Sequence, residues 1–183
     1  MAFVHLHNHT EYSLLDGHTN LKKMAKRAHE FGMPAIAITD HGYMYGVPSF
    51  VSACESEGVK PIIGCEVYFS PDSSLPRDGY PDLYHLILLA KDEEGYENLM
   101  AIVSEAAVNG FYYRPRVTYE SLQAHSTGLI GTSACIAGIV SKSVLRGEYD
   151  KAKDWALKLA SLFEPGDFYL EIQNQGYSYK LNE

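Results

Sequence analysis

Short apolar segments alternate with amphipathic helical segments along the chain, and this alternation restricts the fold more than any other feature of the sequence. Residues 34–39 form a continuous apolar run, as expected for a strand that is buried on both faces. Asn20 and Gly32 enclose a segment with apolar residues at helical spacing, which is typical of a capped amphipathic helix. Alternation with short connections predicts a parallel sheet covered by helices, either an open doubly wound sheet or an incomplete barrel.

The sequence predicts six strands, at 3–7, 34–39, 60–70, 84–90, 129–134 and 167–173, and five helices, at 21–31, 48–57, 92–108, 137–146 and 148–163. Loops are expected at 71–82 and 110–117. The 183 residues fit one compact domain, so we expect a single domain over 1–183. No apolar run approaches the roughly 18 residues that a membrane span needs. The chain start lacks the features of a secretory signal, so we expect a cytoplasmic protein without a membrane partner.

The formal net charge of −8 is unfavourable for a domain that holds nucleic acid through its overall field. If DNA is the substrate, another part of a larger protein must supply most of the affinity, or bound divalent cations must offset the local charge. The chain has three cysteines, Cys54, Cys65 and Cys135. Because their number is odd and the chain shows no secretion signal, a disulfide framework is not expected.

Three histidines alternate at the start of the chain, at His5, His7 and His9. Alternate residues of a strand share a face, so the three imidazoles could point the same way and bind zinc, manganese or iron. The alternative is three solvated histidines on an edge strand. Three histidines at a period of two favour the metal site. Asp16, in an Asp-Gly turn, would then be a carboxylate able to bridge metals.

Further candidate ligands follow or interrupt the later strands. Asp40 and His41 end the second strand, where ligands bind in parallel α/β sheets, although a helix-capping Asp beside a solvated His is the alternative. Glu66 interrupts an apolar strand, which is costly unless it pairs with a Lys or Arg or binds a metal. His85 could instead be a satisfied core histidine. Cys135 could be a packing residue, or a thiolate ligand that favours zinc.

Together these side chains predict a site for several metals at one edge of the sheet. Two metals roughly 3.5–4 Å apart clamp the attacking and leaving oxygens in phosphoryl transfer and activate water. Hydrolysis of a phosphate ester is therefore the predicted reaction class.

The loop Phe-Tyr-Tyr-Arg-Pro-Arg at 111–116 mixes aromatic rings and guanidinium groups. Tyr113, Arg114 and Arg116 are candidates for stacking a base and holding a phosphate. The alternative is a packed loop with two arginines that face solvent.

Several of these stretches resemble the motifs of the PHP (polymerase and histidinol phosphatase) family. FVHLHNHTEYSLLDG resembles the first motif, AIAITDHG the second and GCEVYF the third. YHLILLAKDEEGYENL, GFYYRPRVTYESL and GTSACIAGIVSKSVLRG narrow the resemblance to the PHP domains that begin the alpha subunits of bacterial replicative DNA polymerases. The resemblance covers nearly the whole chain. It implies an α/β fold, a distorted barrel of about seven βα units, with metals at one rim.

The resemblance also implies roles for individual residues. The metal ligands would be His7, His9, Asp16, His41, Glu66, His85 and Cys135, and they would hold two or three divalent ions of zinc, manganese or magnesium. His5 ranks below its neighbours because many relatives carry an Asp there. Catalytic roles fall to Asp16, Asp40 and His41, with Asp40 orienting His41 or assisting as a base without binding metal.

The family's last motif, a strand that ends in Asp-x-His, does not follow the sixth predicted strand of this chain. We therefore expect a barrel truncated before its last strand, with two ligands missing from the metal cage and one sheet edge exposed.

The resemblance implies a 3′–5′ exonuclease that proofreads at a DNA 3′ end, with polymerase domains downstream and other replisome subunits as further partners. One alternative is a metal-stabilised structural module that docks a separate proofreading subunit. Another is a free small-molecule phosphatase of the histidinol phosphatase type.

Overall fold

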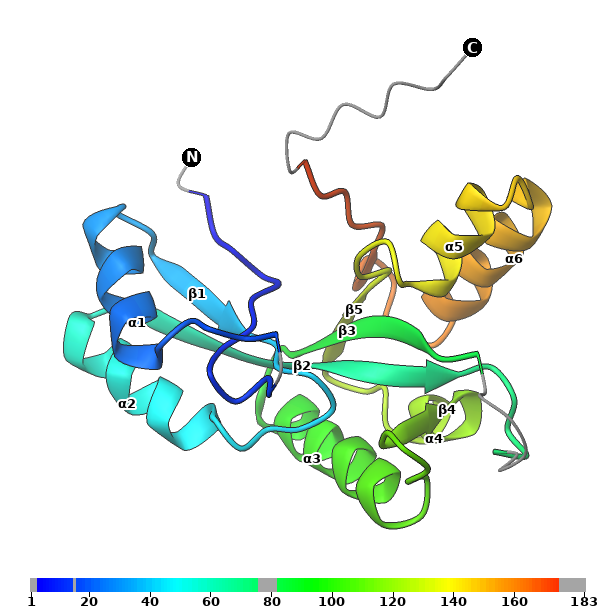
Figure 1. Ribbon diagram of the computed structural model, residues 1–183, viewed down its shortest axis with the longest axis horizontal. Coiled ribbons are helices and arrows are strands. Elements are labelled where there is room, and N and C mark those ends of the chain that lie inside the picture. Colours follow the sequence, from blue (N-terminus) through cyan, green and yellow to red (C-terminus); the bar gives the residue numbers. More distant parts are fainter. Residues whose placement is uncertain (1–2, 15, 76–81, 175–183) are drawn as a thin grey trace.

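The computed structural model describes residues 3–14, 16–75 and 82–174. In these ranges one sheet runs in the order β1-β2-β3-β5-β6, with β4 beside β2. Its strands are β1 (Ala35–Ile38), β2 (Lys60–Ser70), β3 (Tyr84–Ala90), β4 (Arg116–Thr118), β5 (Leu129–Thr132) and β6 (Phe168–Tyr169). The long strands β2 and β3 cross the middle of the molecule (Figure 1).

The sheet is mixed, which corrects the prediction of an all-parallel sheet. The pairs β1–β2, β2–β4 and β5–β6 are parallel, whereas β3 runs antiparallel to both β2 and β5. Parallel neighbours need a crossover, usually a helix, and the sequence predicts no helical segment between β2 and β3. The α/β class holds, since helices still connect most of the strands.

The described helices are α1 (Leu21–Glu30), α2 (Val47–Glu57), α3 (Glu93–Val108), α4 (Tyr119–Ala124), α5 (Ile139–Leu145) and α6 (Tyr149–Ala160). In Figure 1, α1 and α2 lie at one end of the sheet and α5 and α6 at the other. Asn20 and Asp92 cap α1 and α3 through their side chains, at the predicted helix starts. The short elements β4 and α4 were not predicted. No described helix has the length and apolar character that crossing a membrane requires.

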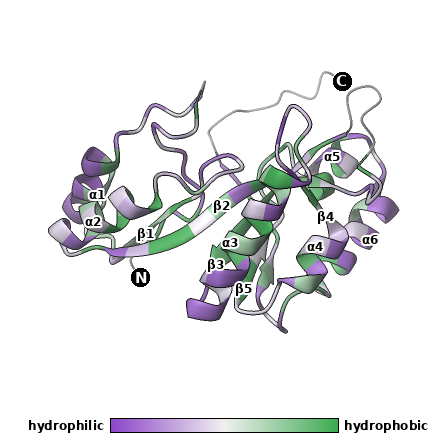
Figure 2. Ribbon diagram, turned by 90° about the horizontal axis from the view of Figure 1, so that it is seen from below, coloured by the Kyte–Doolittle hydropathy of each residue, from purple (hydrophilic) through white to green (hydrophobic). Residues whose placement is uncertain are grey.

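Two main clusters of apolar side chains hold the sheet in place. One lies between β2, β3, β5, α3 and α6 and includes Phe69, Leu88 and Leu99. The other lies between β1, α1 and α2 and includes Ile38 and Phe50. Figure 2 shows β2 extending from one of these regions to the other. The two clusters therefore hold the middle of β2 in place, and Glu66 lies in this part of the strand.

The N-terminal segment runs beside β1 without forming a regular strand. The Ala37 N–H donates to the His5 carbonyl at 3.0 Å, and the Thr39 N–H donates to the Asn8 carbonyl at 3.0 Å. The backbone bends at His7 between these two contacts. The predicted strand at 3–7 is thus an extended segment whose bend changes the direction of the histidines that follow.

Candidate metal centre

Glu66, on β2, lies among four histidines. Its Oε2 is 2.7 Å from His7 Nε2 and 3.8 Å from His9 Nε2. Its Oε1 is 2.5 Å from His41 Nδ1 and 2.9 Å from His85 Nδ1. The side chain is 1% exposed, and no Lys or Arg of the described residues forms an ion pair with it. The alternative of a salt bridge to a core cation is therefore wrong.

The Glu66 carboxylate has close neighbours but no hydrogen bonds. Within the described residues, neither of its oxygens nor His41 Nδ1 has a partner in hydrogen-bond geometry. A buried charge left in this state is costly unless a cation shares the space. Nitrogen and oxygen donors that converge without hydrogen bonding to one another are what a divalent metal requires.

The donors form two groups that share Glu66. One contains His7, His9 and Glu66, the other His41, Glu66 and His85, and in each group the ligand atoms lie within 4.8 Å of one another. These residues can hold metal ions, with Glu66 between two positions. His85 is thus part of the cluster and is not an isolated core histidine.

Asp16 reaches the cluster from the loop between the N-terminal segment and α1. Its Oδ2 is 2.8 Å from His41 Nε2, and its side chain is 62% exposed. The loop depends on Gly17, where a Cβ would lie 1.9 Å from the Thr10 carbonyl oxygen. The tight turn therefore brings a solvent-accessible carboxylate to His41.

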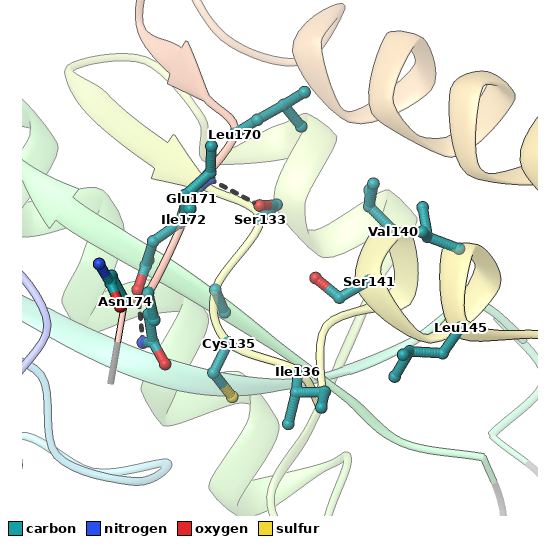
Figure 3. A pocket seen from close by; sticks show the side chains of 13 residues that line it. Ser133, Cys135, Ile136, Val140, Ser141, Leu145, Leu170, Glu171, Ile172 and Asn174 are labelled. Atoms are coloured by element: carbon teal, nitrogen blue, oxygen red, sulfur yellow. Dashed lines mark hydrogen bonds between the residues drawn. The ribbon is translucent and has the colours of Figure 1, made fainter. Parts of the chain in front are cut away.

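Cys135 lies next to His85, just after β5. Its Sγ is 3.6 Å from His85 Nδ1 and accepts the Ala137 N–H at 3.4 Å. These contacts outweigh burial and lower the pKa of the Cys135 thiol. The preceding Ala134 has a left-handed backbone with φ of 56°, a strained conformation for a residue with a side chain. An open groove of about 550 Å³ lies beside Cys135 and Glu171 (Figure 3).

Asp40 is buried and hydrogen-bonded away from the histidine rings. Its Oδ1 accepts from the Thr10 N–H at 2.6 Å and from Ser13 Oγ at 2.8 Å, and its Oδ2 accepts from Thr10 Oγ1 at 2.7 Å. It does not cap α2, whose N-cap is Gly46, so the helix-capping alternative is wrong. The predicted orienting effect on His41 would act through Ser13.

Ser13 was missed by sequence reasoning, although it connects three residues of the site. Besides donating to Asp40, its Oγ accepts the His41 N–H at 3.1 Å and lies 3.1 Å from His9 Nδ1. A small hydroxyl in a loop gives no periodic signal. Only its position four residues after His9 could have drawn attention to it.

Glu171 was also missed. Its Oε1 is 2.7 Å from His7 Nδ1, and its Oε2 accepts from Thr132 Oγ1 at 2.6 Å. A carboxylate on the far nitrogen of a histidine fixes the ring and leaves the other nitrogen for a metal. Glu171 interrupts an apolar predicted strand as Glu66 does, and that signal could have identified it.

His5 does not join the cluster. Its ring contacts Phe3, with centroids 4.9 Å apart, and its side chain lines a shallow groove beside α1. His7 and His9 do meet, with centroids 5.3 Å apart. The expectation that all three histidines share a face is therefore wrong for His5, because the backbone bends at His7.

The carboxylates set the protonation of the cluster. Burial lowers the pKa of His7, but its contacts with Glu171 and Glu66 outweigh burial and raise that pKa to about 10. Burial also lowers the pKa of His85, but its contacts with Cys135 and Glu66 outweigh burial and raise that pKa to about 9. Burial lowers the pKa of His9. The imidazoles hold the pKa of Glu66 well below its ordinary range despite burial.

The loop at 111–116 lies beside Tyr68, whose ring faces that of His41, but its two arginines differ. Arg116 is 2% exposed, and its Nε donates to the Gly110 carbonyl at 2.8 Å. The prediction that Arg116 binds nucleic acid is therefore wrong, because its guanidinium is buried against backbone carbonyls. Tyr113 and Arg114 are exposed. The Arg114 guanidinium lies 5.4 Å from the Tyr68 ring centroid, which is 6.0 Å from that of His41.

Several known proteins are similar to this chain in sequence. A family model described as the PHP domain matches residues 5–175. The DNA polymerase III subunit alpha of Treponema pallidum (strain Nichols) is 44% identical over 179 residues, which cover 96% of this chain and 15% of that protein. That of Helicobacter pylori (strain ATCC 700392 / 26695) is 46% identical over 186 residues, again 96% of this chain and 15% of that protein. The chain thus spans a small part of these relatives.

Among solved structures, a protein of Bifidobacterium adolescentis described as a metal-dependent phosphoesterase is 19% identical, with a TM-score of 0.41. The match covers 90% of this chain and 59% of that chain.

Proposed function

The chain belongs to the PHP family, and on this premise we propose that it is a metal-dependent phosphoesterase that removes nucleotides from a DNA 3′ end. The observation that carries the proposal is the Glu66 carboxylate, which is buried among histidine nitrogens and has no hydrogen bonds in the described structure. Such a carboxylate suits two neighbouring divalent cations. The polymerase relatives support DNA as the substrate. We propose downstream polymerase domains and other replisome subunits as partners.

The metals would polarise the phosphate and lower the pKa of a water molecule when bound. The chain's own residues would position the ligands and accept a proton. Glu171 holds Nδ1 of His7, so that Nε2 faces Glu66. We assign Asp16 as the proton acceptor, because its carboxylate is exposed and its Oδ2 contacts His41 Nε2. Asp40 is a positioning residue that acts through Ser13.

Arg114 is the proposed contact for the DNA backbone. Its guanidinium is exposed, lies over Tyr68 beside His41, and forms no ion pair within the described residues. A free guanidinium next to a metal cluster suits a phosphate that approaches the metals. Tyr113, also exposed, is proposed to contact a base.

The test is release of nucleotide from a 3′-labelled primer with manganese or zinc, comparing the chain with its His9→Ala variant. Release that disappears in a folded His9→Ala variant is the expected result, since His9 belongs to one metal group. Circular dichroism checks folding. Loss of folding in the variant together with no release by the parent chain would overturn the proposal and favour a metal-stabilised structural module.

A second substrate separates the nuclease from a small-molecule phosphatase. We expect hydrolysis of the primer and little hydrolysis of histidinol phosphate. The reverse preference would contradict the DNA assignment while leaving the metal site in place.

A further inference from the structure

Two tyrosines beyond His41 form a stacked pair whose role the metal site does not explain. The rings of Tyr43 and Tyr45 have centroids 5.0 Å apart and are inclined by only 11°. The Tyr45 residue is 70% exposed. An exposed aromatic ring loses the stabilisation that burial would give it, so the exposed ring of Tyr45, stacked on the partly buried Tyr43, suggests a surface for another flat group.

The pair is held close to the metal centre by the chain itself. Tyr43 and Tyr45 follow His41 by two and four residues, so their Cα atoms lie within about 8 Å and 15 Å of that of His41. Gly42 fixes the direction of this segment with a left-handed φ of 68°. A Cβ there would lie 2.8 Å from Pro115 Cγ and 3.0 Å from the Tyr68 ring.

The same packing brings in the basic loop at 111–116. Because Pro115 and Tyr68 both cover Gly42, the Arg114 loop lies against the segment that carries the tyrosine pair. One rim of the site therefore carries two stacked rings and an exposed guanidinium, supplied by two loops that touch.

This combination fits a nucleotide. A guanidinium binds phosphate oxygens, and an aromatic face stacks on any unpaired base without regard to sequence. A base inside a duplex has both faces covered by its neighbours, so the exposed Tyr45 ring requires an unstacked one. A small phosphate ester without a flat ring would leave the pair unused.

Building on the proposed function, we propose that the Tyr43–Tyr45 pair is the subsite for the unpaired terminal base of a DNA strand whose end phosphodiester lies at the metal centre. The pair selects single-stranded or frayed 3′ ends over fully paired ones. Arg114 holds the adjoining phosphate.

The test uses a single-stranded oligonucleotide with 2-aminopurine as the 3′-terminal base. A phosphorothioate linkage slows removal of that base, and the measurement is completed before the parent chain releases any base. Stacking quenches 2-aminopurine fluorescence, so the parent chain should quench the signal on binding. Tyr45→Ala should lose the quenching and bind roughly 5- to 150-fold more weakly, the range for losing one base–aromatic stack. Tyr45→Phe should restore both, because the ring is retained.

Tyr149→Ala is the matched control, since Tyr149 on α6 is 68% exposed and is not part of the site. It should quench and bind as the parent chain does. Equal quenching by Tyr45→Ala and the parent chain would overturn the subsite, as would equal loss in the Tyr149→Ala variant.

A small phosphodiester without a flat ring, glycerophosphocholine, separates this inference from the proposed function. We expect Tyr45→Ala to hydrolyse it at the parent rate with manganese while its activity on the single-stranded oligonucleotide falls. Failure of the parent chain to hydrolyse the small ester, with Tyr45-dependent quenching intact, would overturn the phosphoesterase and leave the base subsite standing. Hydrolysis of the small ester without quenching of the oligonucleotide would do the reverse.

Discussion

Asp40 and Glu66 are both buried carboxylates near the metal centre, yet their surroundings are opposite. Asp40, after β1, accepts hydrogen bonds from the Thr10 backbone, the Thr10 hydroxyl and the Ser13 hydroxyl. Glu66, on β2, has histidine nitrogens within 3 Å and no hydrogen bond of acceptable geometry in the described structure. Burial alone therefore does not identify a functional carboxylate. The bonding around each one separates a structural role from a ligand role.

The largest effect is expected for Asp40→Asn, which tests the structural side of the comparison. The amide keeps one oxygen for the Thr10 N–H and the Ser13 hydroxyl but places an NH₂ group against the Thr10 hydroxyl, so that hydrogen bond is lost and the other two become weaker. We expect a loss of about 3–4 kcal/mol in the free energy of unfolding. Urea unfolding of the metal-free chain measures it. A loss below about 1 kcal/mol would show that the Asp40 network does not hold the N-terminal segment.

Glu66→Gln tests the ligand side. The neutral amide lacks the negative charge and the second oxygen needed to bind two cations, so metal affinity should fall at least about 100-fold. This loss exceeds the roughly 10- to 100-fold effect of removing a residue that only hydrogen-bonds to a metal ligand. Stability of the metal-free chain should change by only about 1–2 kcal/mol, because lost attraction to the imidazoles and relieved desolvation oppose one another. Calorimetric titration with zinc or manganese measures the affinity. Undiminished affinity in the variant would place the metals elsewhere.

The pH dependence should differ between the metal-free and metal-loaded chain. The pKa values of His7 and His85 are raised to about 10 and about 9 by their partners. Their stabilisation of the metal-free fold is therefore complete below about pH 6.5 and is lost as the pH rises through 9 to 10. Metal ions displace these protons, so metal affinity should rise with pH, about tenfold per unit for each proton displaced.

Thermal unfolding between pH 6 and 10 measures both parts of this prediction. The metal-free melting temperature should fall toward pH 10, whereas saturating metal should remove most of that fall. A flat metal-free profile would contradict the proposed pairing of His7 and His85 with their carboxylate and thiol partners.

The smallest effect is expected for Glu171→Gln. The amide can still contact His7 Nδ1 but no longer supplies a charge, so metal affinity should fall about tenfold. The same calorimetric titration serves, with Glu164→Gln as a control, because Glu164 pairs with an exposed lysine outside the site. A loss as large as that of Glu66→Gln would make Glu171 a direct ligand.

Much of the site could be predicted from the sequence because its ligands stand out against their surroundings. His7, His9 and His41 are polar residues next to apolar strands, and Glu66 interrupts one. The structure brings these residues together as predicted. Ser13 escaped because a loop hydroxyl has no periodic signal. Arg116 was misassigned because the sequence places it beside Arg114 in the same loop and cannot show that only Arg114 faces solvent.

The sequence by itself determined the α/β class, the starts of α1 and α3, and the residue types of a metal site, because capping, hydrophobic periodicity and an isolated carboxylate are local properties. Only the tertiary structure decided that β3 runs antiparallel, that His5 turns away and that Glu171 supports His7 across 164 residues of chain. Strand direction, the bend at His7 and the placement of Glu171 follow from how distant segments pack, and packing partners are not encoded at fixed spacing.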